Sequence, residues 1–146
     1  MNITIEYLTH KQFKAEYGGK TKGIHLTTDK GDHLIKLPYH ASTRTRCHEL
    51  AHAYNNDMCG NMKLYEIFEC EVKAEVTAYR YMNRPLNSNI LYSGLSRFNE
   101  MGLLKYLGLH WTFNKALSEL TKYKVIISNQ ERSELWHYIK KISENK

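Results

Sequence analysis

Cysteine is scarce in this chain of 146 residues, which has only Cys47, Cys59 and Cys70. The count is odd and no CxxC pair occurs, so we expect neither a disulfide framework nor a cysteine-type structural zinc site. We expect the three side chains to be small, semi-buried hydrophobic groups in a reducing compartment. Cys47 precedes His48, but neighbouring helix residues point about 100° apart, so Cys47 is a poor ligand for an ion at His48.

Long apolar runs are missing too. No segment approaches the roughly 18 consecutive apolar residues that a membrane-spanning helix requires. The first 13 residues contain no basic patch followed by an apolar run, so we expect no secretory signal. The expected location is therefore the cytoplasm, without membrane insertion, and the sequence specifies no oligomeric state.

The chain also lacks a dense block of one charge. Its 21 Lys and Arg residues against 15 Asp and Glu residues give a net charge of +6, and such a basic balance favours acidic partners, including nucleic acid. The basic residues are scattered, however, and no nucleic-acid-binding motif is present. Nucleic acid is therefore a secondary hypothesis that is supported by charge alone.

The pattern of hydrophobic residues predicts an α+β fold in a single domain, residues 1–146. Residues 1–40 are β-rich, with a strand that alternates apolar and polar residues near the N-terminus and a short helix that ends at a Gly-Gly pair. A hairpin follows, with strands at 23–28 and 32–37. We therefore expect a small antiparallel or mixed sheet at the N-terminus.

Residues 42–146 are expected to be mainly helical. Ser42 or Thr43 caps a first helix that runs to about Met58, where Cys59-Gly60-Asn61 stops it. A second helix runs from Leu64 to Met82, before Pro85. Three further helices are expected at 88–109, 111–123 and 128–142, the last with a capping box formed by Ser128 and Glu131.

The stretch TRTRCHELAHAY, residues 43–54, contains the motif HExxH. Residues four apart on a helix share one face, so His48 and His52 can both reach one ion at a Zn–N distance of about 2.0–2.1 Å. Glu49 lies about 100° around the helix from His48, where it can reach a water at the metal without being a ligand. The motif therefore indicates a zinc site with Glu49 as general base. A surface helix that carries two histidines by chance is the alternative.

A hydrolytic zinc site needs a third protein ligand. On a helical wheel, Glu71 and Glu75 fall within the apolar stripe of the second helix, whereas Glu66 and Glu69 fall on the solvated side. We therefore expect Glu71 to complete a His–His–Glu site. Glu75 would lie behind it and accept the second ring N–H of a ligand histidine.

Buried carboxylates need a partner, because burying one alone costs several kcal/mol. A metal ion is one such partner for Glu71 and Glu75. An ion pair with Arg44, Arg46 or a lysine is the other.

Together these features resemble the gluzincins, zinc peptidases with HExxH on one helix and a glutamate on the next. Within that group the chain most resembles the ImmA/IrrE-type metallopeptidases of phages and mobile elements. HELAHAY is similar to the first part of their pattern, and EVKAEVTAYRYMNRP to the second, with Glu71, Ala74 and Ala78 in register. The resemblance covers roughly residues 40–85, and residues 90–146 match no pattern of the family.

This resemblance implies a zincin-like fold with one Zn²⁺ per chain, held by His48, His52 and Glu71, and with Glu49 as the catalytic base. The implied activity is hydrolysis of peptide bonds in a protein or peptide substrate, such as a regulatory protein. A further donor for the oxyanion is expected, and the candidates are Tyr54, Tyr79, Tyr81 and His40. Packing with a satisfied hydroxyl is the alternative for the tyrosines.

Two other histidines, His25 and His33, lie in the predicted hairpin. They are expected to be surface residues, although they could instead border a cleft. A different class of function also stays open: a catalytically inert, zinc-stabilised interaction protein that binds a host or phage factor. A nucleic-acid-associated protein of mobile elements is the third hypothesis.

Overall fold

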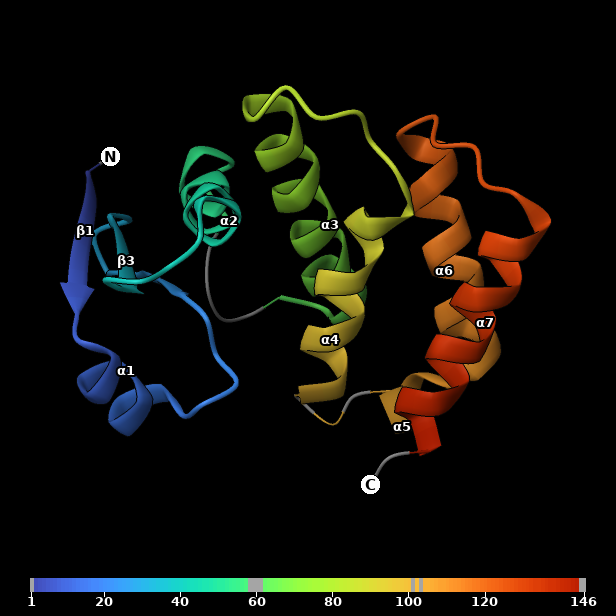
Figure 1. The fold of residues 1–146 in the computed structure, drawn as a ribbon, viewed down its shortest axis with the longest axis horizontal. Coiled ribbons are helices and arrows are strands. Elements are labelled where there is room, and N and C mark those ends of the chain that lie inside the picture. Colours follow the sequence, from blue (N-terminus) through green and yellow to red (C-terminus); the bar gives the residue numbers. More distant parts are fainter. Residues whose placement is uncertain (1, 58–61, 101, 103, 145–146) are drawn as a thin grey trace. The chain divides into compact units, whose positions relative to one another are not determined.

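A computed structural model describes residues 2–57, 62–100, 102 and 104–144. Over these residues the fold is α+β, with a small mixed three-stranded sheet followed by a helical part (Figure 1). The chain divides into two compact units, residues 1–63 (unit 1) and residues 64–146 (unit 2). The expectation of a single domain stays a prediction.

Unit 1 contains the sheet. Its strands are β1 (Ile3–Leu8), β2 (Ile24–Thr27) and β3 (His33–Pro38), in the order β1-β3-β2. β1 is parallel to β3, with Ile5 opposite Ile35. β2 is antiparallel to β3, which confirms the predicted hairpin. The parallel pairing of the first strand makes the sheet mixed.

Both helices of unit 1 begin at capping residues. α1 (His10–Tyr17) starts after Thr9, which forms a capping box with Gln12. α2 (Thr43–Tyr54) starts after Ser42, whose Oγ accepts a hydrogen bond from a backbone N–H in the first turn. A side-chain acceptor here satisfies an N–H that has no partner inside the helix. The predicted cap of α2 at Ser42 is confirmed, and so is the end of α1 before the Gly-Gly pair.

α2 ends before the expected Met58. Asn56 adopts a left-handed backbone conformation with φ of 54°, which asparagine tolerates better than most residues other than glycine. The chain then turns back, and the N–H of Asp57 donates to the carbonyl oxygen of His52 at 2.9 Å. The predicted stop at 59–61, including Cys59, lies outside the described residues, as does Met58.

Unit 2 consists of helices. The predicted second helix is confirmed, and so are the two helices nearest the C-terminus. The predicted helix over 88–109 is instead divided into a 3-10 helix and two short α-helices, and Gly102, with a φ of 67°, separates the two α-helices. The elements are α3 (Leu64–Tyr81), η1 (Ser88–Leu91), α4 (Tyr92–Glu100), α5 (Leu104–Leu107), α6 (Leu109–Lys122) and α7 (Asn129–Glu144).

The predicted capping box at the start of α7 is also present. The N–H of Ser128 donates to Glu131 Oε1 at 3.2 Å, and the N–H of Glu131 donates to Ser128 Oγ at 3.1 Å. These reciprocal bonds satisfy two N–H groups that the helix itself leaves without acceptors.

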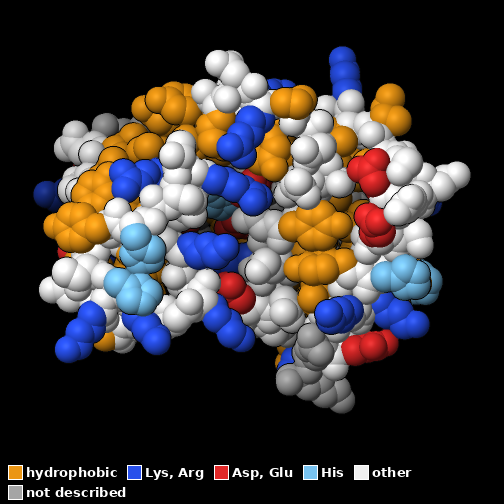
Figure 2. Space-filling view, viewed as in Figure 1, with side chains coloured by type: hydrophobic (Ala, Val, Ile, Leu, Met, Phe, Trp, Pro, Cys, Tyr) orange, Lys and Arg blue, Asp and Glu red, His pale blue; other side chains and the backbone are white. Residues whose placement is uncertain are grey.

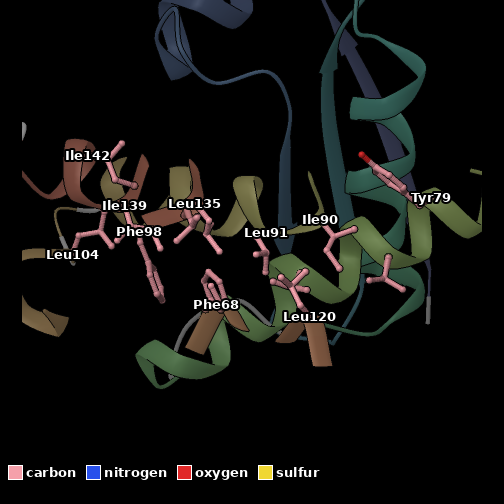
Figure 3. Packing of buried hydrophobic residues seen from close by; sticks show 14 residues of the cluster. Phe68, Tyr79, Ile90, Leu91, Phe98, Leu104, Leu120, Leu135, Ile139 and Ile142 are labelled. Carbon is pink, nitrogen blue, oxygen red and sulfur yellow. The ribbon is translucent and has the colours of Figure 1, made fainter. Parts of the chain in front are cut away.

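A large apolar cluster fills the interior of unit 2 (Figure 3). The rings of Phe68 and Phe98 meet there with centroids 5.3 Å apart. A Cβ added at Gly94 would lie 2.9 Å from the Phe68 ring, so glycine allows α4 to approach α3 closely. Side chains with at most 2% exposure include Phe68, Val72, Val76, Ile90, Leu91, Leu95, Phe98, Leu120, Leu135 and Ile139.

The apolar cluster of unit 1 is much smaller. Its buried members are Ile35, Leu37 and Ala53, with partly buried side chains against them. Four other buried residues of unit 1 are polar or charged, namely His33, His48, Glu49 and His52. The interior of unit 1 therefore needs hydrogen bonds or an ion to stabilise it.

One face of the structure shows how charged side chains lie among the others (Figure 2). On the face shown in Figure 2, Lys and Arg side chains lie among hydrophobic and uncharged ones. No helix of the described residues has both the length and the apolar character needed to cross a membrane. Cys47 and Cys70, the two cysteines in the described part of the chain, form no disulfide there.

Candidate metal centre

The two histidines of the HExxH motif lie on one face of α2, as predicted. His48 is 8% exposed and His52 is 7% exposed. Their Nε2 atoms are 3.1 Å apart, and the rings are nearly perpendicular at 84°. Two nitrogens that bind one tetrahedral zinc ion at about 2.05 Å lie about 3.3 Å apart. The pair therefore has the spacing of two ligands of one ion.

Asp57 fixes the orientation of His52. His52 Nδ1 donates to Asp57 Oδ2 at 2.9 Å, and the aspartate side chain is 10% exposed. A proton on Nδ1 leaves a lone pair on Nε2 of a neutral imidazole, which is the form that binds metal. Sequence reasoning gave this role to Glu75, which is buried in α3 and whose role stays a prediction. The sequence pattern did not indicate Asp57, because this residue reaches His52 only through the turn at Asn56.

A second pair of histidines lies next to the first. His25 Nε2 and His33 Nδ1 are 2.7 Å apart, and His33 Nε2 lies 2.9 Å from Asn56 Oδ1. The His25 ring stacks on the His52 ring, with centroids 5.6 Å apart and planes 15° apart. The expectation that both are surface histidines is wrong for His33, which is 1% exposed.

The register of the hairpin explains this second pair. His25 lies opposite Ile35, so His33 is its diagonal neighbour on the same face of the sheet. The alternation of residues within the hairpin is the signal that could have placed these histidines together. Their position next to α2 depends on tertiary packing, which the sequence pattern does not show.

Glu49, the candidate base, is 9% exposed on α2. A Cβ added at Gly23 would lie 3.1 Å from Glu49 Cγ and 3.0 Å from both Thr45 Cγ2 and Leu37 Cδ2. A larger residue at this position would therefore force these side chains to shift by a few tenths of an ångström. The backbone at Gly23 confines the stem of the Glu49 side chain.

The candidate third ligand, Glu71, lies on α3 in unit 2. Ser93 Oγ on α4 donates to Glu71 Oε2 at 3.3 Å. Glu69, two residues earlier, instead pairs with Lys115 at 2.5 Å. Glu69 is thus 34% exposed and paired, not on a freely solvated face as predicted, and the predicted placement of the two carboxylates on different sides of the helix stays a prediction. Burial extends further around α3 than the predicted stripe, because Val72 and Val76 are buried too.

As a donor set, His48, His52 and Glu71 could hold a metal ion. Two imidazole nitrogens and one carboxylate oxygen suit zinc, and they also suit other divalent transition metals. The set alone therefore does not select the metal. Of the arginines that could pair with the acids instead, Arg46 donates to the carbonyl oxygens of Ala41 and Tyr39.

The predicted oxyanion donors have different environments. Tyr54 is 70% exposed and Tyr81 is 79% exposed, so both side chains extend into solvent. Tyr79 is 5% exposed and belongs to the apolar cluster of unit 2 (Figure 3). His40 packs edge-on against His10, at a cavity of about 300 Å³. Tyr54 and Tyr81 thus extend into solvent, and Tyr79 packs in the apolar cluster. The role of oxyanion donor stays a prediction for all four residues.

No family model matches the chain, and no curated protein or solved structure matches it either. The likeness to gluzincins therefore depends on the motif residues alone. A function has to be inferred from the chemistry of the residues described above.

Proposed function

We propose that this chain is a zinc-dependent peptidase in which His48, His52 and Glu71 bind one Zn²⁺ and Glu49 is the general base. The observation that carries the proposal is the geometry in unit 1. The two Nε2 atoms are 3.1 Å apart, and the Asp57 carboxylate holds the proton of His52 on the opposite nitrogen. Histidines that bind metal commonly donate their second ring N–H to a carboxylate in this way, whereas surface histidines do not require such a partner.

Within the described part of the chain the donor set has three members, which supports a catalytic rather than a structural site. Structural zinc sites use four protein ligands, whereas catalytic sites use three and leave a position open. Two neutral imidazoles and one carboxylate leave one positive charge in the site. That charge favours the oxyanion that forms when a carbonyl is attacked.

Each residue would have a distinct task. When bound, a zinc ion supplies a Lewis acid that polarises a carbonyl and lowers the pKa of water. The Glu49 carboxylate would accept a proton from the attacking water and transfer it to the leaving amine. Ser93 would hold the Glu71 carboxylate in place, as Asp57 holds His52. A protein substrate, such as a regulatory protein, is proposed from the family resemblance.

The test compares wild-type protein with Glu49→Gln. We expect both to contain about one equivalent of zinc by atomic emission. Wild type should cleave a peptide library, with new N-termini detected by mass spectrometry, and Glu49→Gln should be slower by about 10²–10⁴-fold.

Glu69→Gln is the matched control, because it makes the same chemical change on a carboxylate that pairs with Lys115. It should cleave at the wild-type rate. Cleavage by Glu49→Gln at that same rate would refute the assigned role of the glutamate.

A second candidate is a catalytically inert, zinc-stabilised interaction protein. It is favoured by the small apolar cluster of unit 1, which an ion could supplement. Zinc near one equivalent with no cleavage of the library by wild type would select it. Nucleic-acid binding has only the net charge of +6 in its favour. An affinity that does not fall with rising salt would exclude phosphate contacts.

A further inference from the structure

Besides the two candidate ligands on α2, unit 1 contains two further histidines next to that helix. His25 on β2 and His33 on β3 are in hydrogen-bond contact at 2.7 Å, and His33 continues to Asn56 at 2.9 Å. The same His25 ring covers a face of His52. A chain of three side chains therefore connects the turn after α2 to the ring of a candidate ligand.

The hydrogen-bond donors and acceptors of these three side chains match one another. The Asn56 amide oxygen accepts, so His33 Nε2 carries the proton and donates. In a neutral imidazole the other nitrogen then accepts, so His33 Nδ1 accepts from the Nε2–H of His25. One tautomer of each ring satisfies both hydrogen bonds, and the bond to His33 together with the contact with His52 restricts the His25 ring.

A hydrogen bond alone does not fix the His52 ring. The bond from Nδ1 to Asp57 sets one direction in the ring plane, but it still allows small rotations of the ring about the Cβ–Cγ bond. Such a rotation would move Nε2, the atom that must face the ion. The His25 ring lies nearly parallel to the His52 ring, with the ring centroids 5.6 Å apart, and limits how far the His52 ring can tilt towards that side.

We propose that His25 is a positioning residue for His52, acting through ring contact, and that His33 and Asn56 hold His25 in place. The inference rests on the proposed metal site. It gives the turn after α2 two tasks. Asp57 orients the ligand ring from its edge, and Asn56 holds His33, which in turn holds the His25 ring. Partners of this kind commonly change metal affinity by about 10–100-fold when removed.

A merely structural role for His25 is the alternative, in which it only connects the sheet to α2. The two roles differ in what they change. A structural residue alters the unfolding of the zinc-free protein, whereas a positioning residue alters the affinity for the metal and the geometry around it. Co²⁺ reports that geometry through its visible absorption spectrum.

The experiment titrates the full chain with Zn²⁺ against a chromophoric chelator, and separately with Co²⁺. The variants are His25→Ala, which removes both contacts, and His25→Phe, which keeps a ring but loses the hydrogen bond to His33. His10→Ala is the control, because His10 also packs against a histidine in unit 1. Circular dichroism of the zinc-free proteins reports folding.

We expect His25→Ala to weaken zinc binding by about tenfold and to change the Co²⁺ spectrum. The zinc affinity of His25→Phe should lie between those of His25→Ala and wild type, because the phenyl ring still restricts the His52 ring. If His25→Ala does not fold, the comparison of His25→Phe with wild type decides. His10→Ala should match wild type.

Two failures can be told apart. Wild type that binds no zinc overturns the proposed function, and this inference with it. In a second outcome, wild type binds zinc and the folded His25 variants have the same zinc affinity and the same Co²⁺ spectrum as wild type. That outcome overturns the positioning role alone. A His25→Phe variant as weak as a folded His25→Ala would also overturn it, since the ring contact would then contribute nothing.

Discussion

The two units of this chain are stabilised by different means. The interior of unit 2 is a cluster of apolar side chains drawn from most of its helices. The interior of unit 1 combines a smaller set of buried apolar residues with three buried histidines and a glutamate. The buried apolar residues of its described part include Phe13, Ile35, Leu37, Cys47, Ala51 and Ala53. Apolar burial stabilises a fold by about 25 cal/mol per Å², whereas a buried polar group costs free energy unless it has a partner.

This difference indicates where function lies. Unit 2 buries Glu75, Thr112 and Glu119 within a mainly apolar interior, whereas unit 1 buries three histidines and Glu49 beside a small apolar cluster. If the histidine cluster binds zinc, the stability of unit 1 depends on zinc, because binding to the folded state alone stabilises that state. The following changes test the contrast, from the largest expected effect to the smallest.

The largest effect is expected in the apolar cluster of unit 2. Phe98→Ala removes a fully buried ring that packs on Phe68, and it should lower the free energy of unfolding by about 3–5 kcal/mol. Denaturant unfolding of the zinc-free protein measures this loss. Ile126→Ala is the control, since Ile126 is 95% exposed and should change stability by less than about 0.5 kcal/mol. An equal loss of stability in Phe98→Ala and Ile126→Ala would contradict the packing of Phe98 on Phe68.

Removal of zinc should affect mainly unit 1. With free zinc about 1,000-fold above its dissociation constant, binding adds about 4 kcal/mol to stability. We expect a chelator to accelerate hydrogen exchange of amides in β3 and α2, with little change in α7. Acceleration of equal size in α7 would show that the two units do not differ in this way.

Asp57→Asn should weaken zinc binding by about 10–100-fold, because the amide holds the His52 proton less strongly than the carboxylate does. The measurement is zinc titration against a chelator. Asp29→Asn, in the exposed turn before β3, should leave the affinity unchanged. A similar loss in both variants would indicate a general effect of charge.

Gly23→Ala is expected to have a smaller effect. The added Cβ would meet three side chains at 3.0–3.1 Å, including that of Glu49, and should cost about 1 kcal/mol of stability. Because it displaces the candidate base, peptide cleavage should fall while zinc stays bound. Gly19→Ala, whose nearest neighbour is Lys14 Cε at 3.6 Å, should show neither change. Unaltered cleavage in Gly23→Ala would contradict the close approach.

Much of the fold follows from local signals in the sequence. The strands of the hairpin, the Ser42 cap and the Ser128 capping box depend on alternation and on side chains within three residues of one another. The same is true of the pairing of His48 with His52, which four-residue spacing on a helix determines. These features need no knowledge of the rest of the chain.

The features that sequence reasoning missed depend on backbone turns and on tertiary packing. Asp57 reaches His52 only because Asn56 turns the chain back. Gly102, in a left-handed conformation that glycine readily adopts, separates α4 from α5 within the helix predicted over 88–109. The burial of His33 depends on how the sheet packs, which its spacing from other histidines does not specify.

The central claim is that Glu71 is the third ligand of a zinc ion held by His48 and His52. The most direct measurement is the zinc affinity of Glu71→Gln beside that of Glu69→Gln, two identical changes two residues apart on α3. The account predicts near-wild-type affinity for Glu69→Gln and a loss of at least about 100-fold for Glu71→Gln, because an amide is a far weaker zinc ligand than a carboxylate. Equal affinity in the two variants would contradict it.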